Sequence, residues 1–125
     1  MFRTIPRDRH HLGFTEQILS SFGFLITGYG FRVVKTEPMF VRYESSTVFV
    51  NLYHGRASYE LGFEIGRLDD GTGKEEPPYS LNMIMELMHA QEERFFQAST
   101  AERVKKFVAE LADLVRTYTP AVGQD

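Results

Sequence analysis

The feature that most constrains the fold is a period-two alternation of apolar and polar residues, VFVNLYHGRASYELGFEIGRL, which runs from Val48 to Leu68. This period places successive side chains on opposite faces of a strand. Gly55 interrupts the alternation, and a two-residue Gly55-Arg56 loop with glycine first is typical of a tight β-hairpin. The stretch therefore predicts two antiparallel strands that share one buried face.

The two-residue loop also predicts a register for this hairpin. Leu52 would lie opposite Tyr59, and Asn51 would lie opposite Glu60 on the outward face. The inward positions are Val48, Val50, Leu52, Tyr59, Leu61 and Phe63. Because side chains alternate, residues of the outward face cannot also belong to the core in this register.

The outward face carries aromatic residues that need an explanation. In the predicted register Phe49 lies opposite Gly62. An aromatic ring laid across a cross-strand glycine covers backbone that the glycine leaves bare, so we expect Phe49 to cover Gly62. Tyr53 and Phe40 are then left without such a structural role.

Two further strands are expected over residues 31–36 and 39–44, and Ser45-Ser46 is a turn signal that leads into the hairpin. Counting through this turn places Arg42 beside Phe49. Short connections between successive strands favour an antiparallel meander.

Helical periodicity marks three other segments. In residues 14–29, apolar residues recur at spacings of three or four: Phe14, Ile18, Phe22, Leu25 and Tyr29. Gly13 or Thr15 could open this helix, and Gly28 or Gly30 could close it with a left-handed cap.

The second helix is expected from Ser80, its cap, to residue 95. Its buried stripe is Leu81, Ile84, Met85 and Met88. For the last helix, Ser99 and Glu102 predict a capping box, and Pro120 ends it. Its apolar face is wide: Val104, Phe107, Val108, Leu111, Leu114, Val115 and Tyr118.

The predicted architecture is an α+β fold: a helix, a four-stranded antiparallel meander, then two helices, with all helices packed on one face of the sheet. The single domain is expected over residues 13–119, after a loose basic segment at 1–12 and before a tail at 120–125. Residues 69–79 are charged and rich in glycine and proline, and they are interpreted as a loop.

Composition narrows the function classes. A chain of 125 residues supports one core. Its formal net charge of −3 argues against non-specific binding to nucleic acid, which depends on Lys and Arg. The absence of cysteine excludes disulfides and thiolate chemistry. No apolar run is long enough for a membrane-spanning helix and no secretory signal is evident, so we expect a cytoplasmic protein that does not associate with membranes.

Motifs for catalysis or cofactor binding are weak. The stretch from Gly71 to Lys74, GTGK, resembles the end of a phosphate-binding loop, but Glu75 follows where that motif needs Ser or Thr. No G-x-S-x-G nucleophile elbow is present. Glu60 and Glu64 are carboxylates on one strand face with no predicted cleft between them. We therefore expect no catalytic residue and no cofactor, with an enzyme or small-ligand carrier as an alternative.

Metal binding is also not expected. Glu86, His89 and Glu92 lie at i, i+3 spacings on one helix, but carboxylate-bridged metal sites need a second such motif, and none is present. A solvated helix edge is the preferred interpretation of the trio. The His10-His11 pair lies in the basic N-terminal segment, and His54, next to the hairpin loop, is interpreted as a turn residue rather than a general base.

The outward face of the sheet is the remaining candidate site. Tyr, Phe and Arg are favoured in interface cores, and exposed apolar groups often mark binding surfaces. An ordinary solvent-exposed sheet face with cross-strand pairs is the alternative interpretation. The candidate partner-binding residues are Phe40, Arg42, Phe49, Tyr53, Glu60 and Glu64.

Four segments, YGFRVV, VRYESSTVFVNLYHG, ELGFEIGRL and LADLVRTY, resemble small bacterial α+β proteins that are similar to immunity proteins of polymorphic toxin systems. The resemblance spans Phe14 to Tyr118 and rests on packing patterns. It implies a protein that binds and blocks a toxin, commonly through an acidic or aromatic surface. The expected function is thus a non-catalytic protein-binding module. A chaperone-like acidic homodimer that uses the same face is the alternative.

Overall fold

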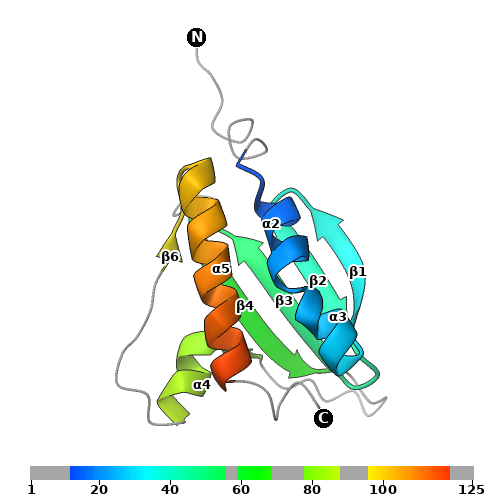
Figure 1. The fold of residues 1–125 in the computed structure, drawn as a ribbon. Helices are drawn as coiled ribbons and strands as arrows, with labels where there is room; N and C mark the ends of the chain where they lie inside the picture. The colour runs from blue at the N-terminus through cyan, green and yellow to red at the C-terminus, as the bar shows by residue number, and fades with distance from the viewer. Residues whose placement is uncertain (1–11, 56–58, 69–77, 88–95, 119–125) are drawn as a thin grey trace.

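The computed structural model describes residues 12–55, 59–68, 78–87 and 96–118 (Figure 1). It has the predicted α+β class, with the helices on one side of an antiparallel sheet. The elements in chain order are α2 (Phe14–Ser21), α3 (Gly23–Tyr29), β1 (Arg32–Glu37), β2 (Phe40–Glu44), β3 (Val48–His54), β4 (Glu60–Arg67), β5 (Tyr79–Ser80), α4 (Leu81–Leu87), β6 (Phe96–Gln97) and α5 (Ala101–Tyr118).

The sheet begins as the predicted meander, in the order β1-β2-β3-β4, and every neighbouring pair is antiparallel. Two short strands extend it beyond the prediction. β5 and β6 both pair with the outer edge of β4, β5 at Glu64 and Ile65 and β6 at Glu60 and Leu61. The chain between them leaves the sheet to form α4, so the last strand of the sheet is split in two.

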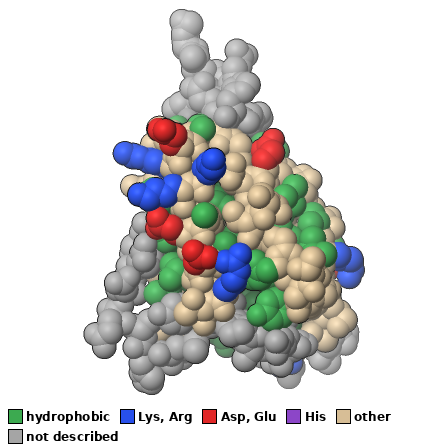
Figure 2. Space-filling view, in the orientation of Figure 1, with side chains coloured by type: hydrophobic (Ala, Val, Ile, Leu, Met, Phe, Trp, Pro, Cys, Tyr) green, Lys and Arg blue, Asp and Glu red, His purple; other side chains and the backbone are tan. Residues whose placement is uncertain are grey.

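The core lies between the sheet and a layer of helices. α2, α3 and α5 lie across one face of the sheet, and α2 packs beside α5 (Figure 1). Figure 2 shows this side of the molecule, with charged side chains gathered over α5. Among the residues predicted to be inward, those that are buried are Phe14, Ile18, Phe22, Leu25, Val48, Val50, Leu52, Leu61, Phe63, Leu81, Ile84, Met85, Val104, Val108, Leu111 and Val115.

The first predicted helix is two helices. The chain changes direction at Phe22, which is fully buried and has non-helical backbone angles. Gly13 precedes α2 and Gly30 follows α3, both with positive φ (77° and 74°), a conformation that glycine adopts without strain. Of the predicted alternatives, Gly13 rather than Thr15 precedes the first helix, and Gly30 rather than Gly28 closes the second with a left-handed cap.

The predicted hairpin register is wrong by four residues. Leu52 pairs with Phe63 rather than with Tyr59, and Asn51 pairs with Glu64 rather than with Glu60. The connection runs from Gly55 to Tyr59 in place of the two-residue loop. Its ends are joined by bonds from the Gly55 N–H to the Glu60 carbonyl (2.7 Å) and from the Tyr59 N–H to the Gly55 carbonyl (3.1 Å).

The predicted β2–β3 register is also shifted, by two residues. Arg42 pairs with Asn51 rather than with Phe49. The Ser45 N–H donates to the Val48 carbonyl (2.8 Å), so the turn lies one residue later than Ser45-Ser46. Both register errors are even numbers of residues, and an even shift leaves each side chain on the same face of its strand. The predicted inward residues that lie in β3 and β4 are therefore inward in the structure.

The predicted cap of α4 is correct, and the predicted cap of α5 is wrong. Ser80 caps α4 as predicted, because its Oγ accepts from the Met83 N–H at 3.2 Å. The α5 cap is Thr100 and not Ser99: Thr100 Oγ1 accepts from the Arg103 N–H at 3.1 Å. With Thr100 in this position, the predicted Ser99–Glu102 capping box does not form.

Several predictions fall on residues outside the described ranges: the segment at 1–11, the GTGK motif, His89 and Glu92, and Met88. The tail from Pro120 also lies outside them. Within the described ranges, no helix combines the length and the apolar character needed to cross a membrane.

Candidate functional site

The outward side of the sheet, which we call the open face, is built by strand alternation. In β2, β3 and β4 buried positions alternate with half-buried or exposed ones, up to the exposed Arg67 at the end of β4. The inward set lies under the helices, and the other set forms the open face. Its members on β1 to β4 are Arg32, Lys35, Glu37, Phe40, Arg42, Glu44, Phe49, Asn51, Tyr53, Glu60, Gly62, Glu64 and Gly66. The six predicted partner-binding residues all lie on it.

Two aromatic rings of the open face cover glycines. Tyr53 lies opposite Gly62, and a Cβ added at Gly62 would overlap the Tyr53 ring. Phe49 lies opposite Gly66, where an added Cβ would come within 2.7 Å of the Phe49 ring. The predicted arrangement, in which an aromatic ring covers a cross-strand glycine, therefore occurs twice. The expectations that Phe49 covers Gly62 and that Tyr53 has no structural role are both wrong.

A hydrogen-bonded polar row crosses the middle of the open face. Arg42 Nη1 donates to Asn51 Oδ1 (3.4 Å), and Asn51 Nδ2 donates to Glu64 Oε1 (3.3 Å). Arg42 Nε also donates to Glu44 Oε2 at 2.9 Å. The amide of Asn51 is thus oriented by a cation on one side and a carboxylate on the other. The Arg42 and Glu44 side chains are only 28% and 22% exposed, so this row is more strongly held than a free surface ion pair.

The remaining aromatic contacts on the open face are with cations. The Arg42 guanidinium lies over the Phe49 ring, 4.2 Å from its centroid, and the Lys35 ammonium lies 5.7 Å from the centroid of Phe40. Arg42 and Phe49 therefore touch as predicted, although they are diagonal and not paired. Each of these contacts gives a ring of the open face a packing role, so aromatic content alone does not mark a binding surface.

Charge is distributed unevenly over the open face. Strands β1 and β2 carry three cations, Arg32, Lys35 and Arg42, which form ion pairs with Glu37 and Glu44, whereas β4 carries Glu60 and Glu64 on this face. Burial raises the pKa of Tyr53, and the nearby carboxylates of Glu64 and Glu60 raise it further. The end of the open face around Tyr53 is therefore negative. At 37% exposed, Tyr53 is an aromatic side chain that solvent reaches at this end.

His54 is a core residue that the sequence reasoning missed. It ends β3, is only 3% exposed, and its Nε2 lies 2.8 Å from the Ala98 carbonyl. Its ring stacks on Phe14 with centroids 5.6 Å apart. The prediction of a turn residue is wrong. The alternation contained the signal, because His54 has the same parity as the inward residues of its strand.

A cleft of about 210 Å³ lies at the outer edge of β4, and we call it the edge cleft. β5 and β6 pair with β4 on either side of Gly62 and Phe63, so the cleft occupies the gap in the split strand. Its lining residues are Tyr53, Glu60, Leu61, Gly62, Phe63, Ser80, Leu81, Asn82, Phe96 and Leu111. Sequence reasoning placed no cleft near Glu60 and Glu64, because the strands that frame it are two residues long.

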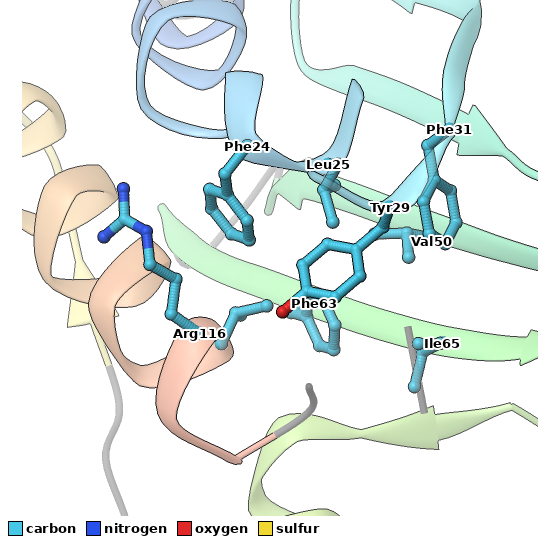
Figure 3. A pocket seen from close by; sticks show the side chains of 9 residues that line it. Phe24, Leu25, Tyr29, Phe31, Val50, Phe63, Ile65 and Arg116 are labelled. Carbon is cyan, nitrogen blue, oxygen red and sulfur yellow. The ribbon is translucent and has the colours of Figure 1, made fainter. Parts of the chain in front are cut away.

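A second hollow lies between α3, the sheet and the end of α5 (Figure 3). Its volume of about 10 Å³ is at the lower limit for a single water molecule. The Arg116 side chain runs alongside Phe24, with its guanidinium 4.5 Å from the ring centroid, and it extends away from the apolar residues of the hollow (Figure 3). We interpret this hollow as a packing gap.

The described residues contain no group of three His, Asp or Glu side chains that could hold a metal ion. No protein family, curated protein or solved structure matches this chain. The function must therefore be argued from the open face and the edge cleft themselves. Their chemistry is that of a surface with a negative, partly apolar end.

Proposed function

We propose that this chain is a non-catalytic, cytoplasmic protein-binding module that uses the open face of its sheet. The observation that carries the proposal is the grouping of the partly exposed Tyr53 with the nearby carboxylates of Glu64 and Glu60 at one end of the open face. Tyrosine is enriched among binding hot spots because it combines a large apolar ring with a polar hydroxyl. Acidic residues beside it would steer a basic partner surface toward the ring.

The organisation of the polar row supports binding without large rearrangement. Arg42, Asn51 and Glu64 are already hydrogen-bonded across three strands, so their side chains lose little freedom when a partner covers them. A surface that is ordered beforehand loses less conformational entropy on binding. The resemblance of the sequence to immunity proteins adds one partner class to test, a toxin domain with a basic surface.

A chaperone-like homodimer is the second candidate, and the charge order favours it. Across the middle of the open face, Lys35 and Arg42 lie on one side of Asn51 and Glu64 lies on the other. A two-fold axis parallel to β3 would place Glu64 of one copy over Arg42 of the second copy. Homodimer interfaces are more apolar than this row, so we rank self-association second.

The test compares charge-reversed variants in a capture experiment. The wild-type chain, a Glu60→Lys/Glu64→Lys variant and a Glu102→Lys control on α5 are immobilised and exposed to lysate of the native host. We expect a protein that the wild type and the control retain and that the open-face variant loses. Thermal melting of all three chains checks that each is folded.

The contact is then mapped with the purified partner. Hydrogen exchange should slow in β3 and β4 and not in α5. Protection confined to the helix side, equal capture by the open-face variant, or capture of no protein above background would each contradict the proposal. Light scattering of the free chain reports the dimer: a mass of two chains that reverts to one in the Glu60→Lys/Glu64→Lys variant would favour the second candidate.

A further inference from the structure

The edge cleft has chemically different ends. Tyr53, Glu60 and Gly62 belong to the open face, because their positions alternate with the buried ones. The other end belongs mostly to the core, with the buried apolar residues Leu61, Phe63, Leu81, Phe96 and Leu111, and Ser80 and Asn82 complete the lining. A group that enters from the open face therefore passes a carboxylate and a tyrosine hydroxyl before it meets a hydrophobic floor.

The size of the edge cleft limits what can enter. Binding sites for drug-sized ligands and cofactors enclose about 300–1,000 Å³. The edge cleft, at about 210 Å³, is smaller than this range and suits a single amino-acid side chain or a fragment of similar size. A nucleotide is too large for it.

The polar mouth and the mostly apolar floor of the edge cleft determine which chemical group can occupy it. A lysine that entered from the open face would place its ammonium against the apolar floor, where a charge without a partner is costly. An apolar side chain would instead bury its surface on that floor. Cationic groups on either side of it would then remain at the mouth, close to Glu60 and Glu64.

We propose that the edge cleft is an anchor site for one apolar side chain of a partner segment in which the neighbouring residues are Lys or Arg. This inference rests on the proposed function and names the part of the partner that the open face selects. The Tyr53 ring forms one wall and also covers Gly62, so the same contact that stabilises the sheet shapes the mouth of the site. The carboxylate of Glu60 lines the same mouth, and Glu64 lies further along β4 on the same face.

The test uses short peptides, so it does not depend on an identified partner. The probe is acetyl-Lys-Leu-Lys-amide, titrated into the ¹⁵N-labelled full chain. We expect one saturable curve for the amides of Gly62, Phe63, Ser80 and Asn82. Acetyl-Lys-Ser-Lys-amide lacks the apolar anchor and acetyl-Glu-Leu-Glu-amide reverses the charge, and each should bind at least about tenfold more weakly.

Matched variants separate the site from general electrostatics. Glu60→Gln should weaken the Lys-Leu-Lys peptide about tenfold, since a charge-assisted contact at the mouth is lost. Glu102→Gln removes the same charge from α5 and should leave binding unchanged. An equal loss in both variants would overturn the inference, because only the net charge would then matter.

Other outcomes are equally decisive. Peptide-induced shifts confined to α5, or equal binding of all three peptides, would overturn the anchor site. Equal affinity of isoamylamine, with shifts at the same amides, would assign the edge cleft to a free amine and overturn the partner-segment proposal. Peptide binding without any captured protein would leave the anchor site standing and refute the proposed function. A partner held on the open face that Glu60→Gln does not affect, together with no peptide binding, would refute only the anchor site.

Discussion

Because the Tyr53 ring covers Gly62, we expect Gly62→Ala to destabilise the wild-type chain and to stabilise a chain that lacks this ring. Gly62 does not have a left-handed backbone, so an L residue fits its conformation. Alanine in the interior of a strand is about 0.5–1 kcal/mol more favourable than glycine on conformational grounds. The Gly62→Ala methyl group, however, would occupy the space of the Tyr53 ring.

The size of the loss follows from what must move. Overpacking costs about 1–3 kcal/mol, and the Tyr53 ring is the free end of a partly exposed side chain, so the low half of this range applies. After the conformational gain is subtracted, we expect Gly62→Ala to destabilise the wild type by about 1 kcal/mol. In a Tyr53→Ala background the obstacle is gone, and the same change should stabilise by about 0.5–1 kcal/mol.

Urea denaturation of the four chains in this double-mutant cycle measures the coupling, which we expect to be about 1.5–2 kcal/mol. Gly66→Ala is the matched comparison. The Phe49 ring over it is held by Arg42, and the Pro78 backbone would lie 3.4 Å from the new methyl group, so the loss should be larger. The reasoning fails if Gly62→Ala stabilises the wild type or if the coupling is zero.

Three further predictions concern the core and the caps. The Tyr43 hydroxyl is fully buried and makes no hydrogen bond to any described residue, so Tyr43→Phe should stabilise the chain by about 1 kcal/mol in urea denaturation. Burial raises the pKa of Tyr43 from 10.0 to about 12, so Tyr43 ionises at lower pH in the unfolded chain than in the folded one. The stability present below pH 10 is therefore lost between pH 10 and 12. Tyr43→Phe should reduce this loss. Thr100→Ala should cost about 1 kcal/mol and Ser99→Ala close to nothing, and equal losses in thermal melting would restore Ser99 as the cap. Leu111→Ala should cost about 2–5 kcal/mol, and an unchanged melting temperature would contradict its place in the core.

The sequence predicted the faces of the strands better than their pairing. Alternation is a property of each strand alone, and it assigned the inward residues of β3 and β4 correctly. Register depends on the loop, and the structure uses Tyr59 with a positive φ of 58° next to the Gly55–Glu60 hydrogen bond. A tyrosine in that conformation is uncommon. The composition of the segment therefore favours a two-residue loop, which the structure does not have.

The short strands β5 and β6 could not be predicted from the sequence, for a different reason. β5 and β6 have two residues each, and a period of two cannot be recognised in so short a stretch. They exist because β4 offers an edge that the returning chain can pair with, which is a tertiary cause. The edge cleft between them could not be predicted without these strands.

The corrected register changes which part of the open face carries the functional argument. In the predicted register Tyr53 has no structural role, and its exposure would then indicate a partner. With Tyr53 over Gly62 and Phe49 over Gly66, both rings are explained by the stability of the sheet. What sheet stability does not explain is the gap in the last strand, where a hydrophobic floor opens beside the Glu60 carboxylate. The β4 edge, where Tyr53 and Glu60 meet, therefore supports the proposed function best, and Glu60→Gln tests it without disturbing the rings that stabilise the sheet.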